Sequence, residues 1–420
     1  MINVKLFKWL ANQRKTQTLI VKQVSLNKLQ KWNVNKNEIC HVSKKFFRII
    51  GIRIRSNFYK KNWDQPIIYQ NEIGILGILK NVKTKKYLLQ AKVEPGNINK
   101  IQLSPTVQAT KSNYSRIHGG KLIPYLKYFT KKNKNFSLQS EQAFRYFNKK
   151  NSNIISLISK NIPVGKTFRW FSKKEIINLL YKRNLINMDT LSVLSSFIKK
   201  NDKDFPINNS KYLSKWTSFL NKKYYLKSQK KKLNSLNLWN MSSKSITHKF
   251  KKYFSIIGIK VESNKREISE WYQPIIKPIG LAFAGFIIKD FNKTEHYLCR
   301  YILKPGSKIN TFSCTVNTSQ LKNYKHSIDI LPFQKKMISK FFLKKGSNII
   351  YNNILSDEGG RFFHSQINYM ACKLKKNENI NLPKNYIWLS KNQIIDLIKK
   401  QKIDIEARLL FGIINFKGII

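Results

Sequence analysis

The stretch YLLQAKVEPG, from Tyr87 to Gly96, recurs as YLCRYILKPG, from Tyr297 to Gly306. Further repeats surround this pair in the same order along the chain. With one constant spacing, the chain repeats Trp9, Trp32, His41, Phe47 and Gly51 as Trp216, Trp239, His248, Phe254 and Gly258. With small insertions, it repeats Trp63, Gln65, Pro66, Asn113, Tyr114, Ser140, Arg145 and Trp170 as Trp271, Gln273, Pro274, Asn323, Tyr324, Ser356, Arg361 and Trp388. Collinear matches of this kind predict a tandem duplication.

The boundary between the two copies is predicted near the polar, turn-rich segment NDKDFPINNS, residues 201–210. We therefore expect an N-terminal copy of residues 1–206 and a C-terminal copy of residues 207–420. A chain of 420 residues exceeds the usual single-domain range, so two domains, each with its own core, are expected.

Both copies show the same order of predicted elements. An opening helix contains Trp9 or Trp216, and the strand-like FFRIIGIRIRS or YFSIIGIKVES follows. IGILGILK and KYLLQAKVEP, or GLAFAGFII and HYLCRYIL, are also strand-like. The closing segments KKEIINLLYKR and KNQIIDLIKKQ place Ile and Leu at helical spacing. The chain is thus predicted to belong to the α+β class, with a mixed α/β lobe in each copy.

The formal charge of +59, from 80 Lys and Arg against 21 Asp and Glu, is typical of proteins that bind nucleic acid or anionic membranes. A nucleic-acid-binding protein would need a continuous basic groove with exposed aromatic residues. Here the lysines are spread over nearly every segment, among Asn, Ile, Phe and Tyr, and no RNP-type or zinc-finger motif is present. These residues share AT-rich codons, which favours drift in an AT-rich genome over selection, and no nucleic acid partner is predicted.

The spacing of the cysteines and the N-terminal sequence indicate the cellular compartment of the protein. Cys40, Cys299, Cys314 and Cys372 are widely separated, which argues against a zinc site or a disulfide framework and favours a reducing cytoplasm. MINVKLFKWLANQRK lacks the features of a signal peptide, and no run of about 18 apolar residues occurs. We expect a soluble, unprocessed cytoplasmic protein with no membrane partner.

Several longer motifs carry a resemblance to a known family. They are WDQPIIYQNEIGILGIL, the run LLQAKVEPGNINKIQLSPTVQATKSNYSRIHGG, SEQ at residues 140–142, NMDT at residues 187–190, SDEGGRFFHSQINYM and IDIEARLL. Through them almost the whole chain resembles the NDP-hexose 2,3-dehydratases of deoxysugar biosynthesis. The resemblance implies a two-lobed subunit with a Nudix-like α/β motif in each lobe, and a homodimer. Neither copy contains the glutamate-rich Nudix box that holds magnesium, so pyrophosphate hydrolysis and a metal site are not expected.

The chemistry implied by the resemblance is loss of water across carbons 2 and 3 of a dTDP-4-keto-6-deoxyhexose. The ketone at carbon 4 acidifies the proton on carbon 3, and hydroxide leaves carbon 2. This needs a general base, a donor to the enolate oxygen and an acid for the leaving group, but no cofactor. The product would become a 3,4-diketo-2,6-dideoxy sugar nucleotide, which a partner ketoreductase would reduce.

Three polar residues of the first copy suit this reaction. In a strand, Gln90, Lys92 and Glu94 lie on one face by the two-residue period, while Ala91 and Val93 point inward. Glu94 is the predicted base, Lys92 the oxyanion donor or acid, and Gln90 an orienting hydrogen-bond partner. A solvated strand face with an ordinary Lys/Glu pair is the structural alternative.

The substrate-binding candidates are spread over both copies. A loop-like, Gly-terminated stretch follows the triplet and supplies Thr106, Gln108, Asn113, Tyr114 and His118. The remaining candidates are Gln65, Glu141, Arg361 and His364. His118 equally fits a plain surface histidine, and the SDEGGRFFH motif, which contains Glu358, Arg361 and His364, equally fits a buried ion pair that stabilises a turn.

The second copy departs from the catalytic pattern because Arg300, Ile302 and Lys304 replace Gln90, Lys92 and Glu94. A base cannot be built from those three residues, so this copy is expected to be structural or to keep a remnant nucleotide pocket. In the first copy, Leu191 follows NMDT where many relatives would have arginine, which removes one anion contact. A homologue that binds sugar nucleotide without turnover is therefore the alternative function.

Overall fold

The computed structural model describes residues 4–115, 117, 119, 121–130, 135–264, 266, 268–322, 324–326 and 330–418. Each copy opens with a helix that contains its repeated tryptophan, as predicted. These are α1 (Val4–Thr16) and α6 (Ser210–Lys223).

Each copy then contributes a small sheet, antiparallel except for one strand of the first copy, that receives one strand from the other copy. In the first copy the sheet contains β2 (Trp32–Val34), β3 (Glu38–His41), β4 (Arg48–Ser56), β5 (Lys61–Tyr69) and β11 (Tyr146–Phe147), which pairs in parallel. In the second it contains β15 (Trp239–Met241), β16 (Ser245–His248), β17 (Phe254–Ser263) and β18 (Glu270–Pro278). The strand β1 (Leu19–Val24) pairs with β17, and β14 (Leu226–Lys231) pairs with β4. The two copies therefore exchange strands.

Each copy also forms a larger mixed sheet, and the predicted strands are confirmed there. The first is ordered β10 (Phe136–Ser140), β12 (Lys150–Ile158), β6 (Gly74–Asn81), β7 (Tyr87–Val93) and β13 (Phe168–Phe171), with β8 (Ile101–Ser104) on β7 and β9 (Val107–Ala109) on β6. The second is ordered β23 (Ile349–Ser356), β24 (Gln366–Lys373), β19 (Ala282–Phe291), β20 (Thr294–Ile302) and β25 (Tyr386–Ser390), with β21 (Thr311–Ser313) on β20 and β22 (Val316–Thr318) on β19.

One sequence-based expectation is wrong in this region. The stretch after Gly96, expected to be loop-like, forms β8, β9 and the short helix α2 (Lys111–Tyr114). The segments Ile101–Ser104 and Val107–Ala109 are short, but they complete the ladders of β7 and β6 and bury nearly all of their side chains. Pairing with β7 and β6 therefore stabilises two segments that are too short to be predicted as strands from the sequence alone.

The two predicted closing helices are confirmed as α4 (Lys173–Leu180) and α8 (Lys391–Lys399), and each copy adds a final helix, α5 (Met188–Ser195) or α9 (Ile405–Ile414). Reciprocal capping boxes begin α4 and α8, between Ser172 and Glu175 and between Ser390 and Gln393. The remaining short helices are η1 (Leu26–Lys28), α3 (Lys127–Thr130), η2 (Leu233–Ser235), η3 (Tyr324–His326), α7 (Pro332–Met337), η4 (Ile338–Phe342) and η5 (Phe416–Gly418).

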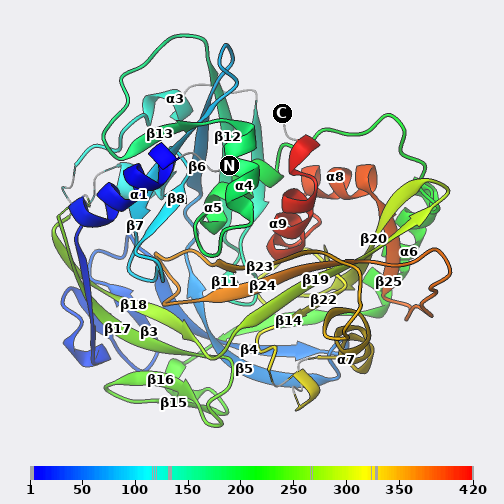
Figure 1. The fold of residues 1–420 in the computed structure, drawn as a ribbon. Helices are drawn as coiled ribbons and strands as arrows, with labels where there is room; N and C mark the ends of the chain where they lie inside the picture. The colour runs from blue at the N-terminus through cyan, green and yellow to red at the C-terminus, as the bar shows by residue number, and fades with distance from the viewer. Residues whose placement is uncertain are drawn as a thin grey trace.

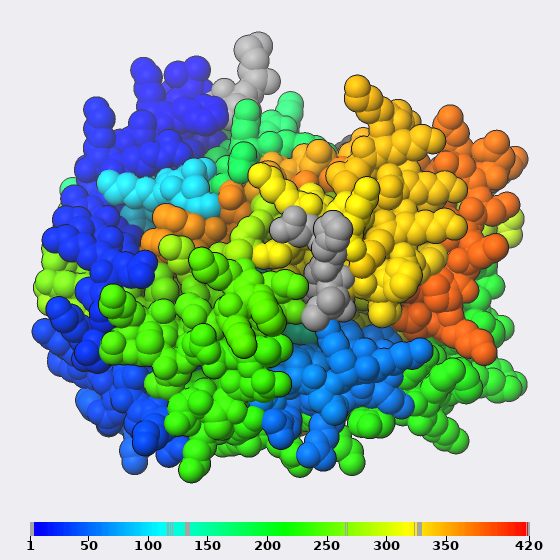
Figure 2. Space-filling model, turned by 90° about the horizontal axis from the view of Figure 1, so that it is seen from below, coloured from blue at the N-terminus to red at the C-terminus, as the bar shows by residue number. Residues whose placement is uncertain are grey.

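The two final helices pack against each other at the centre of the molecule (Figure 1). The buried Arg408 of α9 donates to the carbonyl of Ser192 in α5. A side-chain carbon added at Gly412 of α9 would lie 2.4 Å from Ser195 Cβ, so glycine permits this close approach. One hydrophobic cluster includes residues of α1, α5, α9 and both large sheets. The copies thus share a core, and seen from below their segments alternate across the surface (Figure 2).

The chain is a mixed α and β protein built from two repeated halves. In the part of the chain that the structure describes, helices of the length and apolarity needed to span a bilayer do not occur.

Candidate functional site

Two reciprocal loops join the copies where the functional residues gather. After β23, residues 357–361 lie against the turn that follows β7, where Gly96 N donates to Gly359 O at 2.7 Å. His364 N returns a hydrogen bond to Gly96 O at 3.0 Å. In the other half, Gly306 N donates to Ala143 O at 2.7 Å. In each half, a loop of one copy is therefore hydrogen-bonded to the turn at the end of a strand of the other copy.

The predicted catalytic residues of the first copy lie at this junction. Lys92 Nζ lies 3.3 Å from Glu94 Oε1, and Gln108 Nε2 donates to the same oxygen at 3.1 Å. Ala91 and Val93 point into the core, as the strand period predicts. The Lys92 and Glu94 side chains are only 10% and 4% exposed, which does not fit the alternative of a solvated strand face. Both are held in a shielded polar cluster.

Three more buried carboxyl groups belong to the same electrostatic cluster: Glu141 and Asp189 of the first copy, and Glu358 of the second. Burial and the charge of Glu358 raise the pKa of Asp189 well above its ordinary value. Burial and the charge of Glu94 raise that of Glu358, against the opposing charge of Arg361. Tyr146 Oη donates to Glu358 Oε2 at 2.8 Å. The cluster therefore holds carboxyl groups that tend to keep their protons, as acid catalysis requires.

Glu141 offers a test of this buried charge through pH. Burial, then the charge of Glu358, raise the pKa of Glu141 from 4.5 to about 7. The folded protein therefore binds more protons than the unfolded chain between these values, and the free energy of unfolding falls as pH rises through this window. Glu141→Gln removes the charge but keeps an acceptor for Asn151, which donates to Glu141 Oε1 at 2.6 Å.

We expect the melting temperature of Glu141→Gln to fall less than that of the wild type between about pH 5 and about pH 8. Scanning calorimetry at both pH values measures the difference. Glu270→Gln, which removes a 47% exposed carboxylate, is the matched control. An unchanged pH dependence in Glu141→Gln would contradict this account of the cluster.

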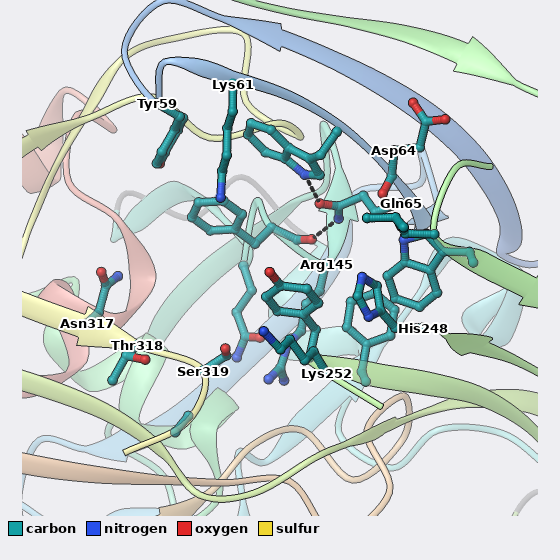
Figure 3. A pocket seen from close by; sticks show the side chains of 18 of the residues that line it. Tyr59, Lys61, Asp64, Gln65, Arg145, His248, Lys252, Asn317, Thr318 and Ser319 are labelled. Carbon is teal, nitrogen blue, oxygen red and sulfur yellow. Dashed lines mark hydrogen bonds between the residues drawn. The ribbon is translucent and has the colours of Figure 1, made fainter. Parts of the chain in front are cut away.

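A cavity of about 380 Å³ lies in the second half and is lined by both copies. The first copy contributes Lys61, Trp63, Gln65 and Arg145, and the second contributes Lys252, Arg300, Ile302, Asn317 and Glu406, among others. Figure 3 shows Lys61 and Gln65 across the cavity from Asn317 and Thr318. Gln65 Nε2 donates to Phe144 O at 2.7 Å and Gln65 Oε1 accepts from Trp63 at 2.9 Å. Cations and aromatic walls of this kind suit an anionic ligand that carries a flat ring.

Lys304 lies beneath this cavity in an ion-pair cluster. Its Nζ lies 2.8 Å from Asp404 Oδ2 and 2.9 Å from Glu406 Oε2, and its side chain is 2% exposed. Burial lowers the pKa of Lys304, but the two carboxylates outweigh this effect and raise it above the ordinary value. Lys304 therefore stays protonated as a fixed cation.

Several residues that line the cavity correspond by the repeat to residues of the first-copy site. By the repeat, Arg300, Ile302 and Asn317 correspond to Gln90, Lys92 and Gln108. Likewise, Gln142, Arg145 and Glu406 correspond to Glu358, Arg361 and Asp189. The structure supports this register, because Leu103 bridges to Ile186 in the first copy as Phe312 bridges to Ile403 in the second. At two of these positions, Lys92 and Glu358 of the first copy thus replace the neutral Ile302 and Gln142, which line the cavity in the second.

The other predicted binding residues are dispersed. Thr106 Oγ1 donates to Leu88 O and accepts from Leu79 N, so its hydroxyl links β6 to β7. Tyr114, in α2, packs against an apolar cluster on the outer side of the large sheet, next to Asn113. His364 is exposed and stacks on Phe363. His118 lies outside the described residues.

Arg361 and Gln90 lie closer to the predicted site. Arg361 Nη1 donates to Gly360 O at 3.0 Å, and its guanidinium lies 4.1 Å from the centre of the Phe47 ring. Gln90 pairs with Ser104 and Phe168 across the sheet and is half-buried. The SDEGGRFFH motif predicts an acidic group at Glu358, whereas no sequence pattern singles out Tyr146 or Asp189, although NMDT contains Asp189.

Comparison with known proteins gives consistent matches over nearly all of the chain. A family model described as NDP-hexose 2,3-dehydratase matches residues 3–197 and 210–414. Three relatives are named dTDP-4-dehydro-6-deoxy-alpha-D-glucopyranose 2,3-dehydratase. The protein from Saccharopolyspora spinosa is 29% identical, covering 96% of this chain and 89% of its own length. Those from Streptomyces violaceoruber and Amycolatopsis orientalis are 28% and 29% identical, each covering 97% of this chain and 96% and 89% of their own lengths.

Among solved structures, the crystal structure of an ADP compounds hydrolase aligns with 39% of this chain and 84% of its own, at 13% identity and a TM-score of 0.25. Among the described residues, no group of three or more His, Cys, Asp or Glu side chains is placed to hold a metal ion.

Proposed function

Because the chain belongs to the NDP-hexose 2,3-dehydratase family, whose model matches both copies, we propose that it removes water across carbons 2 and 3 of a dTDP-4-keto-6-deoxyhexose. The product is a 3,4-diketo-2,6-dideoxy sugar nucleotide. The observation that carries the proposal is the shielded contact between Lys92 Nζ and Glu94 Oε1 at 3.3 Å. A cation on β7 and a base directly after its end are what proton removal beside a ketone requires.

In this mechanism Glu94 takes the proton from carbon 3, and Lys92 donates to the oxygen that becomes negative on carbon 4. The two groups suit these roles because they lie in a shielded site, where electrostatic stabilisation of an enolate is stronger than in water. Gln90 orients the sugar. Gln108 bonds Glu94 Oε1 at 3.1 Å and thereby holds the base in position.

The cavity of the second copy supports this location through the internal repeat. Ile302 and Arg300 line the cavity of the second copy, and Lys92 and Gln90 occupy the corresponding places in the first. We propose direct substrate contacts for Gln108 and Arg361 on the same ground, and for Gln65 in the second cavity, where Arg145 and Arg300 suit a diphosphate. The predicted contacts of Thr106, Asn113, Tyr114, Glu141 and His364 stay predictions.

We further propose that residues 1–206 and 207–420 are Nudix-like units of a bilobal subunit, which pairs with a second copy in the cytoplasm. The matching large sheets support the two units, and the exchanged strands β1 and β14 indicate that they do not separate. The four buried, unpaired cysteines fit a reducing compartment. A ketoreductase is the expected consumer of the product, because neighbouring ketones are reactive.

The test is to incubate the purified full chain with dTDP-4-keto-6-deoxyglucose and follow the mass of the sugar nucleotide. We expect loss of one water molecule per substrate with no added cofactor. Binding without loss of water, measured by calorimetry on the same sample, would overturn the dehydration and leave the alternative of a homologue that only binds the sugar nucleotide.

A further inference from the structure

The dehydration needs an acid for the departing hydroxyl, and the second copy carries one into the first-copy site. The loop after β23 seats on the Pro95–Gly96 turn through the bond from Gly96 N to Gly359 O. Side-chain carbons added to these glycines would collide: at Gly96 with Phe362 O at 1.7 Å, and at Gly359 with Asn97 Oδ1 at 2.2 Å. Only backbone-to-backbone contact brings the loop this close.

This contact between the loop and the turn brings the carboxyl groups of Glu358 and Glu94 close together. Gly360 lies between the two carboxyl groups. A Cβ atom added to Gly360 would lie 2.9 Å from Glu358 Oε1 and 3.8 Å from Glu94 Oε1. Glu358 comes from the second copy and Glu94 from the first. Glu358 Oε2 accepts from Tyr146 Oη at 2.8 Å, which leaves Oε1 on the side of Gly360 and Glu94.

The internal repeat provides a comparison for this position. Gln142 corresponds to Glu358 and lines the cavity of the second copy, so a side chain at this position of the loop faces the ligand space. Gln142 Nε2 donates to Asp357 Oδ1 at 2.7 Å and has no proton to give in acid catalysis. The site with the Lys92–Glu94 pair thus receives an acid, whereas the other site receives an amide.

We propose that Glu358 is the catalytic acid that protonates the hydroxyl leaving carbon 2. This inference rests on the proposed dehydration at Lys92 and Glu94. Glu94 removes the carbon 3 proton, and the electron pair of that bond forms the enolate. The carbon 4 ketone then re-forms, a double bond forms between carbons 2 and 3, and the bond from carbon 2 to oxygen breaks as Glu358 gives its proton to form water.

The remaining steps restore both groups without any oxidation or reduction. The product of elimination is an enol that bears a hydroxyl on carbon 3. The Glu358 carboxylate takes the proton of that hydroxyl, and Glu94 returns its proton to carbon 2. Burial, with the Glu94 charge acting against that of Arg361, raises the pKa of Glu358, which favours the protonated form that the first step needs.

Deuterium exchange in D2O distinguishes the loss of the catalytic acid from the loss of the catalytic base. Removing the acid while the base remains lets the enolate form and return, so unreacted substrate gains deuterium at carbon 3. We expect Glu358→Gln to lower product formation roughly 10²- to 10⁴-fold while carbon 3 exchanges faster than in an enzyme-free control. Proton NMR resolves carbon 3 from carbon 5, which also lies beside the ketone.

Control variants fix the interpretation. Glu270→Gln, at an exposed position, should match the wild type, and Glu358→Asp, which keeps a carboxyl group, should recover part of the turnover. The fold should tolerate Glu358→Gln because Gln142 occupies the corresponding turn, and equal melting temperatures would verify this. Wild-type turnover in Glu358→Gln, or lost turnover without carbon 3 exchange, would overturn the inference. Failure of the wild type to dehydrate would instead overturn the proposed function.

Discussion

Glu94→Gln is expected to lower turnover roughly 10²- to 10⁴-fold, because it removes the base that takes the proton from carbon 3. Glutamine keeps the length of the side chain and an oxygen that still accepts from Gln108, which bonds Glu94 Oε1 at 3.1 Å. The buried contacts of Lys92 and Gln108 should therefore stay in place. The measurement is the rate of water loss from dTDP-4-keto-6-deoxyglucose under saturating substrate.

Two further measurements make the result specific to Glu94. Carbon 3 exchange in D2O should be lost together with turnover, unlike the exchange expected of Glu358→Gln. Glu270→Gln, which removes an exposed carboxylate, should turn over as the wild type does. A Glu94→Gln protein that loses water at the wild-type rate would remove Glu94 from the mechanism.

The spacing of apolar residues predicts the helices and strands of this fold that are determined by residues close together in sequence. The alternation in FFRIIGIRIRS and the helical spacing in KKEIINLLYKR correspond to β4 and α4. The two-residue period of β7 also places Lys92 and Glu94 together without knowledge of the rest of the chain. The repeat predicts the duplicated order of elements because both copies keep their Trp, Gly and Pro positions.

Pairing between the copies lies outside such reasoning. The small sheets of the two copies share one pattern of apolar and polar residues, so the sequence is equally compatible with β1 pairing with β4 or with β17. In the structure β1 pairs with β17. The same holds for Glu358, which lies far from Glu94 in sequence and reaches it through the crossing loop. Thr106 is polar like a ligand contact, yet its hydroxyl links two strands.

Gly96→Ala is expected to disrupt the junction between the copies more than any surface substitution. The added carbon would lie 1.7 Å from the carbonyl oxygen of Phe362, and a backbone atom cannot rotate away as a side chain does. Overpacking of this kind typically costs about 1–3 kcal/mol of unfolding free energy. Because the same contact seats the loop that carries Glu358, turnover should fall together with stability.

Urea unfolding and the dehydration rate, measured on the same preparation, test this coupling. Gly165→Ala is the matched control, since its added carbon would come no closer than 3.3 Å to the ring of Phe168 and 3.8 Å to the hydroxyl of Tyr125, which are both side-chain groups. That variant should keep both stability and turnover. If Gly96→Ala kept the wild-type dehydration rate and urea unfolding midpoint, this contact could not be what holds the loop. The account of how the loop of the second copy brings Glu358 to Glu94 would then be wrong.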